Sequence, residues 1–183
     1  MHQRQLPSFS DLGSFLSHLS RKGEVCEVGA PVSMRLEITE LHRQVIAAGG
    51  AVLRLTRPLD VRGEAARLPV VTNLFGTRER VASGLGTDLN GLKSLGEMMA
   101  WLRSPKPPQS LREARSLLPA ARGALLARPK AVPRPRAWRE ADPDLSALPV
   151  QHCWPGDAGP LITWPIVVTR APGVDDFSSY NLG

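Results

Sequence analysis

A chain of 183 residues allows one large domain, or a small domain followed by part of another. Its 42% hydrophobic content excludes a disordered chain, and the lack of a signal peptide or of an apolar run near roughly 20 residues predicts a cytoplasmic protein, at most peripheral to a membrane. The net charge of +6 suggests an acidic partner, but residues 101–140 hold ten Lys or Arg against two acids, so the surplus belongs to one segment and not to a folded basic face.

The first expected helix covers residues 8–20, where apolar side chains recur every three or four positions. Its inward side holds Phe9, Leu12, Phe15, Leu16 and Leu19. Ser8 or Ser10 is expected to cap its start, and Gly23 to end it after two basic residues. A short strand is predicted over residues 25–28, because apolar and polar side chains alternate there.

The next helix is expected over residues 36–48 and ends at a pair of glycines. Its inward side holds Ile38, Leu41, Val45 and Ile46. The β-branched runs 51–55 and 69–72 are predicted strands, and residues 57–67 between them are predicted to be a polar connection.

The Asn-Leu-Phe-Gly segment at residues 73–76 is predicted to be a turn that leads into a helix. Thr77 is expected to cap this helix, which runs to Ser83, and a further helix is expected over residues 92–102. Helices that alternate with short strands predict a mixed α/β layer structure, and we place this domain at residues 1–104.

A basic, proline-rich connector is predicted over residues 105–144. The seven prolines within residues 101–140 and the weak apolar periodicity favour an extended link over a packed layer. Structure is expected to resume near Leu145, in a second domain at residues 145–183 whose first strand covers residues 162–169.

Spacing alone reveals no acid–base pair and no activated nucleophile. His18 and His42 are expected to have a structural or surface role at solvated positions of their helices, and Arg80 in its charged cluster is expected on a solvated helix face. Cys26 and Cys153 have neither metal-ligand nor disulfide spacing, so both are expected to be small buried side chains.

The block at residues 152–183 combines a glycine- and proline-rich loop, a strand and an Asn-x-Gly turn. The glycines allow backbone to approach a ligand closely. Thr163 offers a hydroxyl, Asn181 an amide oxygen suited to a hard divalent cation, and Gly183 a backbone N–H suited to phosphate. An ordinary β-turn explains the same pattern equally well, so the residues alone leave both interpretations open.

Motifs along the whole chain carry a resemblance to a known family. In the C-terminal half they are Cys153-Trp154-Pro155, Asp157-Ala158, Pro160-Leu161-Ile162-Thr163-Trp164, Val168-Thr169-Arg170 and Asn181-Leu182-Gly183. In the N-terminal half they are Gly23-Glu24-Val25, Leu36-Glu37-Ile38-Thr39-Glu40, Asn73-Leu74-Phe75-Gly76-Thr77, Arg80-Val81-Ala82 and Pro105-x-Pro107-Pro108. In order and spacing these motifs resemble the UbiD family of prenylated-flavin-dependent decarboxylases, best known for the 4-hydroxy-3-polyprenylbenzoate decarboxylases of ubiquinone biosynthesis. The polar run 57–67 and the long hairpin loop 171–180 depart from the family's pattern.

The resemblance implies that the α/β domain is followed by the start of a flavin-reductase-like split β-barrel, which holds prenylated FMN. It implies that Thr163 lines the cofactor pocket and that Gly183 lies at a further pocket-lining position. Asn181 is implied to help hold a divalent metal, usually manganese, at the cofactor phosphate, and potassium is a further expected ion. The family's arginine and its glutamates follow later in the pattern, so the catalytic residues are expected beyond Gly183.

The implied function is the N-terminal part of a non-oxidative carboxy-lyase for aromatic or α,β-unsaturated carboxylic acids, expected to be inactive as a 183-residue fragment. Implied partners are the small-molecule acid, a flavin prenyltransferase that supplies the cofactor, and further copies of the chain in a homo-oligomer. Two alternatives stay open. The chain could be a truncated, non-catalytic subunit or stand-alone domain whose basic connector binds phosphate-rich partners, or a nucleic-acid-binding protein.

Overall fold

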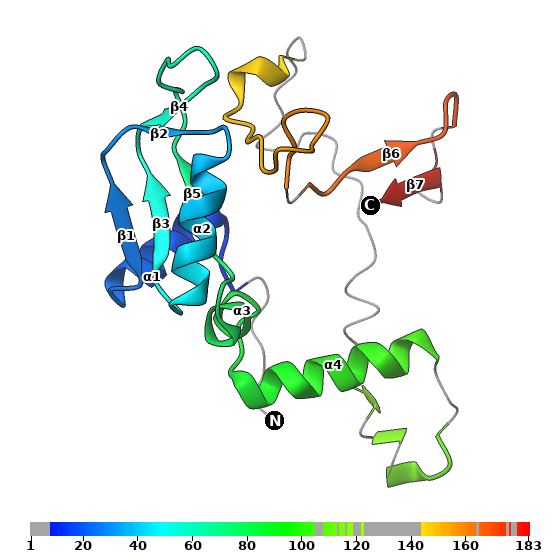
Figure 1. Cartoon of the computed structure of the whole chain (residues 1–183). Helices are drawn as coiled ribbons and strands as arrows, with labels where there is room; N and C mark the ends of the chain where they lie inside the picture. The colour runs from blue at the N-terminus through cyan, green and yellow to red at the C-terminus, as the bar shows by residue number, and fades with distance from the viewer. Residues whose placement is uncertain are drawn as a thin grey trace. The chain divides into compact units, whose positions relative to one another are not determined.

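The structure, a computed structural model, describes residues 8–104, 108–112, 114–115, 117–118, 122, 144–163, 165–174, 176 and 179–183 (Figure 1). These residues form two compact units. The first unit holds residues 8–93 and 144–163, and the second holds the described residues of 94–122 and 165–183. The first unit is thus discontinuous in sequence. Most of the predicted connector lies outside the described residues, and the predicted domain limits stay a prediction.

Three strands form the central sheet of the first unit: β1 (Val25–Val28), β3 (Val52–Leu55) and β5 (Val70–Thr72). β3 lies in the middle, parallel to β1 and antiparallel to β5. In this register Leu55 pairs with Val28 on one side and with Val70 on the other. All three strands lie within the predicted ranges, because their β-branched runs are bounded by glycine or proline.

A helix packs against each face of this sheet. Because successive side chains of a strand point to opposite faces, Val52 packs with α1 (Leu12–Arg21), whereas Leu53 and Leu55 pack with α2 (Glu37–Ala47). The buried residues on the α1 side are Phe15, Leu19 and Val52, and those on the α2 side are Val32, Met34, Ile38, Leu53, Leu55 and Val70. The layers confirm the predicted mixed α/β class, while the split barrel stays a prediction.

The start of α1 differs from its prediction, because Asp11 and neither Ser8 nor Ser10 is the cap. The Asp11 carboxylate accepts the Ser14 amide N–H at 2.7 Å, and the Ser14 hydroxyl accepts the Asp11 amide N–H at 3.3 Å. The Ser14 N–H, helped by the Ser10 hydroxyl, holds the pKa of the Asp11 carboxyl below its ordinary value. This reciprocal pair satisfies N–H groups that lack a helical partner, so the helix begins at Leu12.

A second, smaller sheet was not predicted. It pairs β2 (Val32–Ser33) in parallel with β4 (Pro58–Leu59), and β4 lies in the run expected to be a polar connection. Strands of two residues show too little alternation to be recognised in a sequence. The prediction for Ile46 was also wrong, since its side chain is 42% exposed while Leu41 and Val45 pack against the core.

A buried polar network joins α3 (Arg78–Gly84) to the sheet, so the prediction of a solvated Arg80 was wrong. Arg80 is 4% exposed, and its Nη2 donates to the carbonyls of Gly50 at 3.1 Å and Asn73 at 3.2 Å. The Asn73 side-chain amide donates to the same Gly50 carbonyl at 3.0 Å. A carboxylate oxygen of Glu24 lies 3.9 Å from Nη1 of Arg80 and supplies the opposite charge.

Two helix predictions for the following region are confirmed. The Thr77 hydroxyl accepts the Arg80 amide N–H at 3.2 Å and caps α3, and α4 (Leu89–Arg103) includes the whole of the predicted range 92–102. None of the described α4 residues is buried. In the described part of the chain, no helix is long and apolar enough to cross a membrane.

In the second unit, β6 (Val168–Arg170) and β7 (Tyr180–Leu182) form an antiparallel hairpin (Figure 1). The strand predicted over residues 162–169 was therefore wrong in its first part, since residues 162–163 and 165–167 are not in a strand. Pro165 explains the late start, because proline has no N–H to donate to a ladder.

Candidate functional site

The segment at residues 144–163 returns to the first unit and extends its smaller sheet. The His152 N–H donates to the Met34 carbonyl at 3.0 Å, and the His152 carbonyl accepts the Leu36 N–H at 2.9 Å. Met34 in turn donates its N–H to the Leu59 carbonyl at 2.8 Å. A backbone ladder thus runs from β4 to residue 152 and fixes the place of the returning segment.

The returning segment then folds back on itself around a glycine-rich turn. The Trp154 N–H donates to the Asp157 carboxylate at 2.9 Å, which closes this turn. On its two sides, Gln151 and Leu161 form an antiparallel bridge in which the Leu161 N–H donates to the Gln151 carbonyl at 2.8 Å. The arms that lead into and out of the turn therefore lie side by side.

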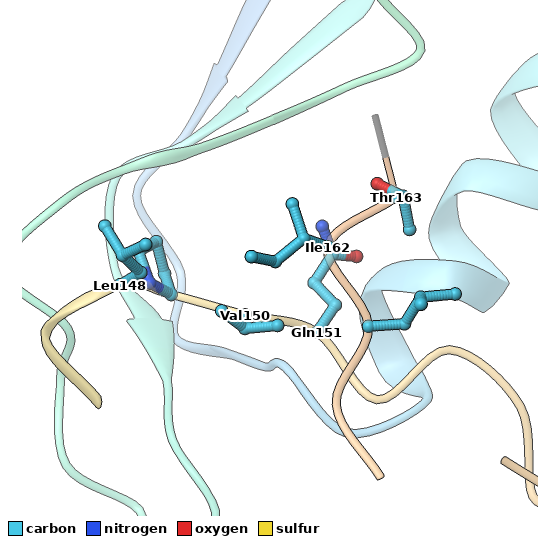
Figure 2. A pocket seen from close by; sticks show the side chains of 7 residues that line it. Leu148, Val150, Gln151, Ile162 and Thr163 are labelled. Carbon is cyan, nitrogen blue, oxygen red and sulfur yellow. The ribbon is translucent and has the colours of Figure 1, made fainter. Parts of the chain in front are cut away.

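These two arms line a cavity of about 180 Å³. Five apolar residues and two with hydrogen-bonding side chains form its wall: Leu148, Pro149, Val150, Leu161, Ile162, Gln151 and Thr163. Figure 2 shows the Gln151 side chain extending toward the arm that carries Ile162 and Thr163. Neither the Gln151 amide nor the Thr163 hydroxyl has a hydrogen-bond partner among the residues that the structure describes. A mostly apolar wall with a few polar groups is typical of small-molecule sites.

Thr163 lies at the rim of this cavity, in a bend and not in the strand that was expected there. Its residue is exposed, so a ligand could reach the hydroxyl from the cavity side. The bend places it two residues after the Leu161 bridge, which limits how far it can move from Gln151. Its assignment to a cofactor pocket stays a prediction.

A second cavity, of about 250 Å³, lies where the returning segment meets α2. Its wall is formed by Leu36, Thr39, Glu40, Cys153, Trp154 and Pro155. Both carboxylate oxygens of Glu40 are engaged, by Arg43 at 2.9 Å and Gln44 at 3.0 Å, and the Arg43 hydrogen bond holds the pKa of Glu40 below its ordinary value. Cys153 is buried as predicted, whereas Cys26 is exposed on the edge strand β1, contrary to the prediction.

Asn181 and Gly183 lie together on the hairpin of the second unit. Asn181 is exposed and pairs with Thr169 across the ladder. The prediction of a free Gly183 N–H was wrong, because this group donates to the Val167 carbonyl at 3.0 Å. Thr163 belongs to the first unit, whereas Asn181 and Gly183 belong to the second.

The side-chain oxygen of Asn181 is one group in this hairpin that could bind a cation. An amide oxygen is an acceptable donor for hard divalent cations such as Mn²⁺, so the residue fits its predicted role by type. Within the described ranges, no group of three or more His, Cys, Asp or Glu could hold a metal ion.

The prediction of solvated histidines was wrong. His42 Nδ1 lies 2.6 Å from the Thr72 hydroxyl, and His18 Nε2 lies 3.4 Å from the Ser83 hydroxyl; both rings are half-buried. Each ring joins a helix to a neighbouring element. Both histidines therefore serve packing in the first unit.

Sequence reasoning also missed Gln151, the second polar group of the cavity. It stands in a short stretch without apolar periodicity, and nothing in the sequence shows that it pairs with Leu161 ten residues later. A bridge of one residue pair leaves no pattern of alternation. Only the folded arrangement of the two arms identifies it.

The family comparisons cover most of the chain. Residues 16–99 match the family of 3-octaprenyl-4-hydroxybenzoate carboxy-lyase N-terminal domains (UbiD_N). Residues 128–183 match the family of Rift-related domains of the same carboxy-lyase (UbiD).

Solved structures of one enzyme match as well. An evolved dimeric form of the UbiD-class enzyme HmfF from Pelotomaculum thermopropionicum, in complex with prFMN, is 27% identical, with a TM-score of 0.58 over 93% of this chain and 34% of that chain. HmfF from the same organism in complex with FMN is also 27% identical, with a TM-score of 0.58 over 93% of this chain and 32% of that chain. The chain thus spans about a third of the length of these structures.

Proposed function

Because the chain belongs to the UbiD family, we propose that it forms the N-terminal part of a non-oxidative carboxy-lyase that uses prenylated FMN. Its substrates in this proposal are aromatic or α,β-unsaturated carboxylic acids such as 4-hydroxy-3-polyprenylbenzoate. The two family matches and the likeness to flavin-bound HmfF support the reaction class. Since the chain spans about a third of those structures, we propose that turnover needs further residues, the catalytic ones included.

The observation that carries the proposal is the cavity beside Thr163. A flavin ring is flat and largely apolar, and it carries hydrogen-bonding groups at one edge. The cavity wall suits one part of such a group, because most of it is aliphatic and the Gln151 amide and Thr163 hydroxyl are not engaged by described residues. When bound, prenylated flavin supplies the electron sink for the electrons left as CO2 departs.

The chain's own residues hold and shield the cofactor in this proposal. The Thr163 hydroxyl binds the cofactor from the rim of the cavity, and Leu161 and Ile162 supply apolar contacts beside it. Asn181 donates its amide oxygen to a manganese ion at the cofactor phosphate, with potassium as a further ion. Gly183 makes room for that phosphate because it has no side chain. Its N–H does not bind the phosphate in this proposal, because it already donates to the Val167 carbonyl in the hairpin ladder.

We also propose the setting in which this site is assembled. A flavin prenyltransferase supplies the cofactor, the protein works in the cytoplasm, and the complete enzyme is a homo-oligomer. The evolved HmfF form is described as dimeric, which supports an oligomeric state without fixing its size.

The test compares Asn181→Ala with Asn90→Ala, which removes an exposed amide from α4, in the protein extended to the length of its relatives and made together with a flavin prenyltransferase. Asn181→Ala should lower manganese and flavin content and CO2 release from the acid substrates. The thermal midpoint of the cofactor-free protein should stay unchanged, because an exposed amide contributes within about 0.5 kcal/mol to stability. Equal metal and flavin content in the two variants would refute the Asn181 assignment, and no CO2 release from any acid would refute the reaction class.

A further inference from the structure

The buried polar network between α3 and the central sheet contains one donor and one acceptor that no described residue engages. They are the Nε–H of Arg80 and the side-chain oxygen of Asn73. Both residues are almost completely buried, at 4% and 3% exposed. Buried polar atoms in folded proteins nearly always have a hydrogen-bond partner, which is either the protein itself or an ordered water molecule. Two such atoms in one network therefore point to a further molecule bound there.

The hydrogen bonds within the network fix the chemical character of both atoms. The Asn73 side-chain nitrogen donates to the carbonyls of Gly50 at 3.0 Å and Ala51 at 2.9 Å, so the amide cannot be turned over and its oxygen is an acceptor. Nη2 of Arg80 donates to the carbonyls of Gly50 and Asn73. Nη1 lies 3.9 Å from a carboxylate oxygen of Glu24, which leaves the Nε–H without an acceptor.

The side chains of Asn73 and Arg80 meet beside Gly76. A Cβ on Gly76 would lie 1.8 Å from the Asn73 side-chain oxygen and 3.1 Å from Nη2 of Arg80. The Gly76 backbone therefore covers one side of this oxygen, but an amide oxygen has two lone pairs and can accept a hydrogen bond from another direction. Since both side chains also share the Gly50 carbonyl, a small molecule can contact the two together.

The charges around the two atoms decide which kind of molecule fits. The positive charge of Arg80 disfavours a cation. An anion is disfavoured because the Asn73 oxygen only accepts hydrogen bonds and because Glu24 already supplies a negative charge. An uncharged molecule that accepts one hydrogen bond and donates another satisfies both atoms. Water is the smallest such molecule, and buried waters typically pair with polar groups that the protein leaves unpaired.

We propose that an internal water molecule bridges Arg80 and Asn73, accepting a hydrogen bond from Arg80 Nε and donating one to the Asn73 side-chain oxygen. The bridge completes the network that joins α3 to the sheet. It also links the buried charge of Arg80 to the turn at residues 73–76 through a bond that neither side chain makes directly. This site belongs to the first unit and does not depend on the proposed function.

The test measures contacts between water and the isotopically labelled 183-residue chain by NMR. The Arg80 Nε–H signal should exchange slowly with solvent, because the group is buried and hydrogen-bonded. It should show cross-peaks to water of opposite sign in NOESY and ROESY spectra, which identifies a bound water and not direct proton exchange. Arg54, whose ion pair with Glu27 is exposed, is the control, and its Nε–H should show fast exchange only.

A pair of variants gives a second measurement. Arg80→Met removes the donor and should lower the number of long-lived internal waters, which magnetic relaxation dispersion of the water signal counts. Arg54→Met should leave this number unchanged. Exchange at Arg80 Nε–H as fast as at Arg54, or a slowly exchanging Nε–H without the water cross-peak, would overturn the proposal. An equal number of internal waters in the wild type and in folded Arg80→Met would also overturn it. If Arg80→Met does not fold, the cross-peak in the wild type decides.

Discussion

The central sheet of the first unit and the β6–β7 hairpin of the second differ in how their strands are covered. Val52 and Leu55 in β3 have no exposed surface, because a helix packs on each face of their sheet. In the hairpin every strand residue is exposed, including the apolar Val168 at 56% and Leu182 at 68%. A sheet with two covering layers is stable by itself, whereas a two-stranded hairpin is marginal without further strands or helices.

The most direct test of this difference shortens one leucine in each sheet. Leu55→Ala should lower the free energy of unfolding of the first unit by about 3 kcal/mol, because it leaves a cavity in a closed core. Leu182→Ala should change it by less than about 0.5 kcal/mol, because its side chain already faces solvent. Urea denaturation of both variants gives the comparison. Similar losses would mean that the hairpin shares the core of the first unit.

The same difference in burial explains why the sequence predicts the central sheet better than the hairpin. The β3 run and the α2 stripe of Ile38, Leu41 and Val45 can be read directly, because burial on fixed faces imposes a periodic pattern. The hairpin is partly predictable, but its start at Val168 depends on the ladder and on Pro165.

The cavity lies beyond what the sequence alone can predict. Its wall is assembled by single-residue bridges, Arg35 with His152 and Gln151 with Leu161, and such contacts between distant residues leave no local pattern. The residues alone left the role of Thr163 open and the family resemblance assigned it to a cofactor pocket, whereas Gln151 was not found at all. Arg80 was missed for another reason. Its charged neighbours in the sequence are typical of a solvated helix face, although its side chain is buried.

A second pair of variants compares buried with exposed charge inside the first unit. Arg80→Met should cost about 3 kcal/mol in the free energy of unfolding, because the Asn73 carbonyl loses its buried Arg80 donor and the Gly50 carbonyl keeps only the Asn73 side-chain amide. Arg54→Met breaks an exposed ion pair with Glu27 and should cost less than about 1 kcal/mol. Chemical denaturation measures both. If the two losses were equal, the Arg80 network would contribute no more than a surface pair.

The same glycine substitution should have opposite effects in the two units. In Gly76→Ala the new Cβ would lie 1.8 Å from the Asn73 side-chain oxygen, so the buried turn must shift at a cost of about 2 kcal/mol. Gly96 lies in α4, and a Cβ added there would have no neighbouring atom within 4 Å. Gly96→Ala should therefore stabilise that helix by about 0.5 to 1 kcal/mol. Thermal melts should show a lower midpoint for the first and an equal or higher one for the second. A destabilised Gly96→Ala would indicate that a neighbour packs against this face of α4.

The smallest expected effect concerns pH and the cap of α1. Hydrogen bonds hold the pKa of Asp11 below its ordinary value of 3.8 in the folded chain, so its charge contributes stability above that value. That contribution is lost as the pH falls through the folded pKa. Asp11→Asn keeps a capping side chain without a charge, so it should be less stable than the wild type near pH 6, and this difference should shrink as the pH falls through the folded pKa of Asp11. Denaturation curves across this range check the sign, and a gap that widens toward low pH would contradict it.

The bond between Leu36 and His152 also sets an order of events during synthesis. Leu36 begins α2 without a side-chain cap and with a left-handed φ of 67°, a costly conformation for a leucine. Its N–H partner is made 116 residues later, which at ribosomal speeds of about 5 to 20 residues per second is a delay of about 6 to 23 seconds. Once Thr72 has been made the larger sheet has all its strands, but the Met34 carbonyl and the Leu36 N–H stay open until residue 152 follows. Until residue 152 is made, a chaperone or an unrelated strand can pair with these open backbone groups at the edge of the smaller sheet.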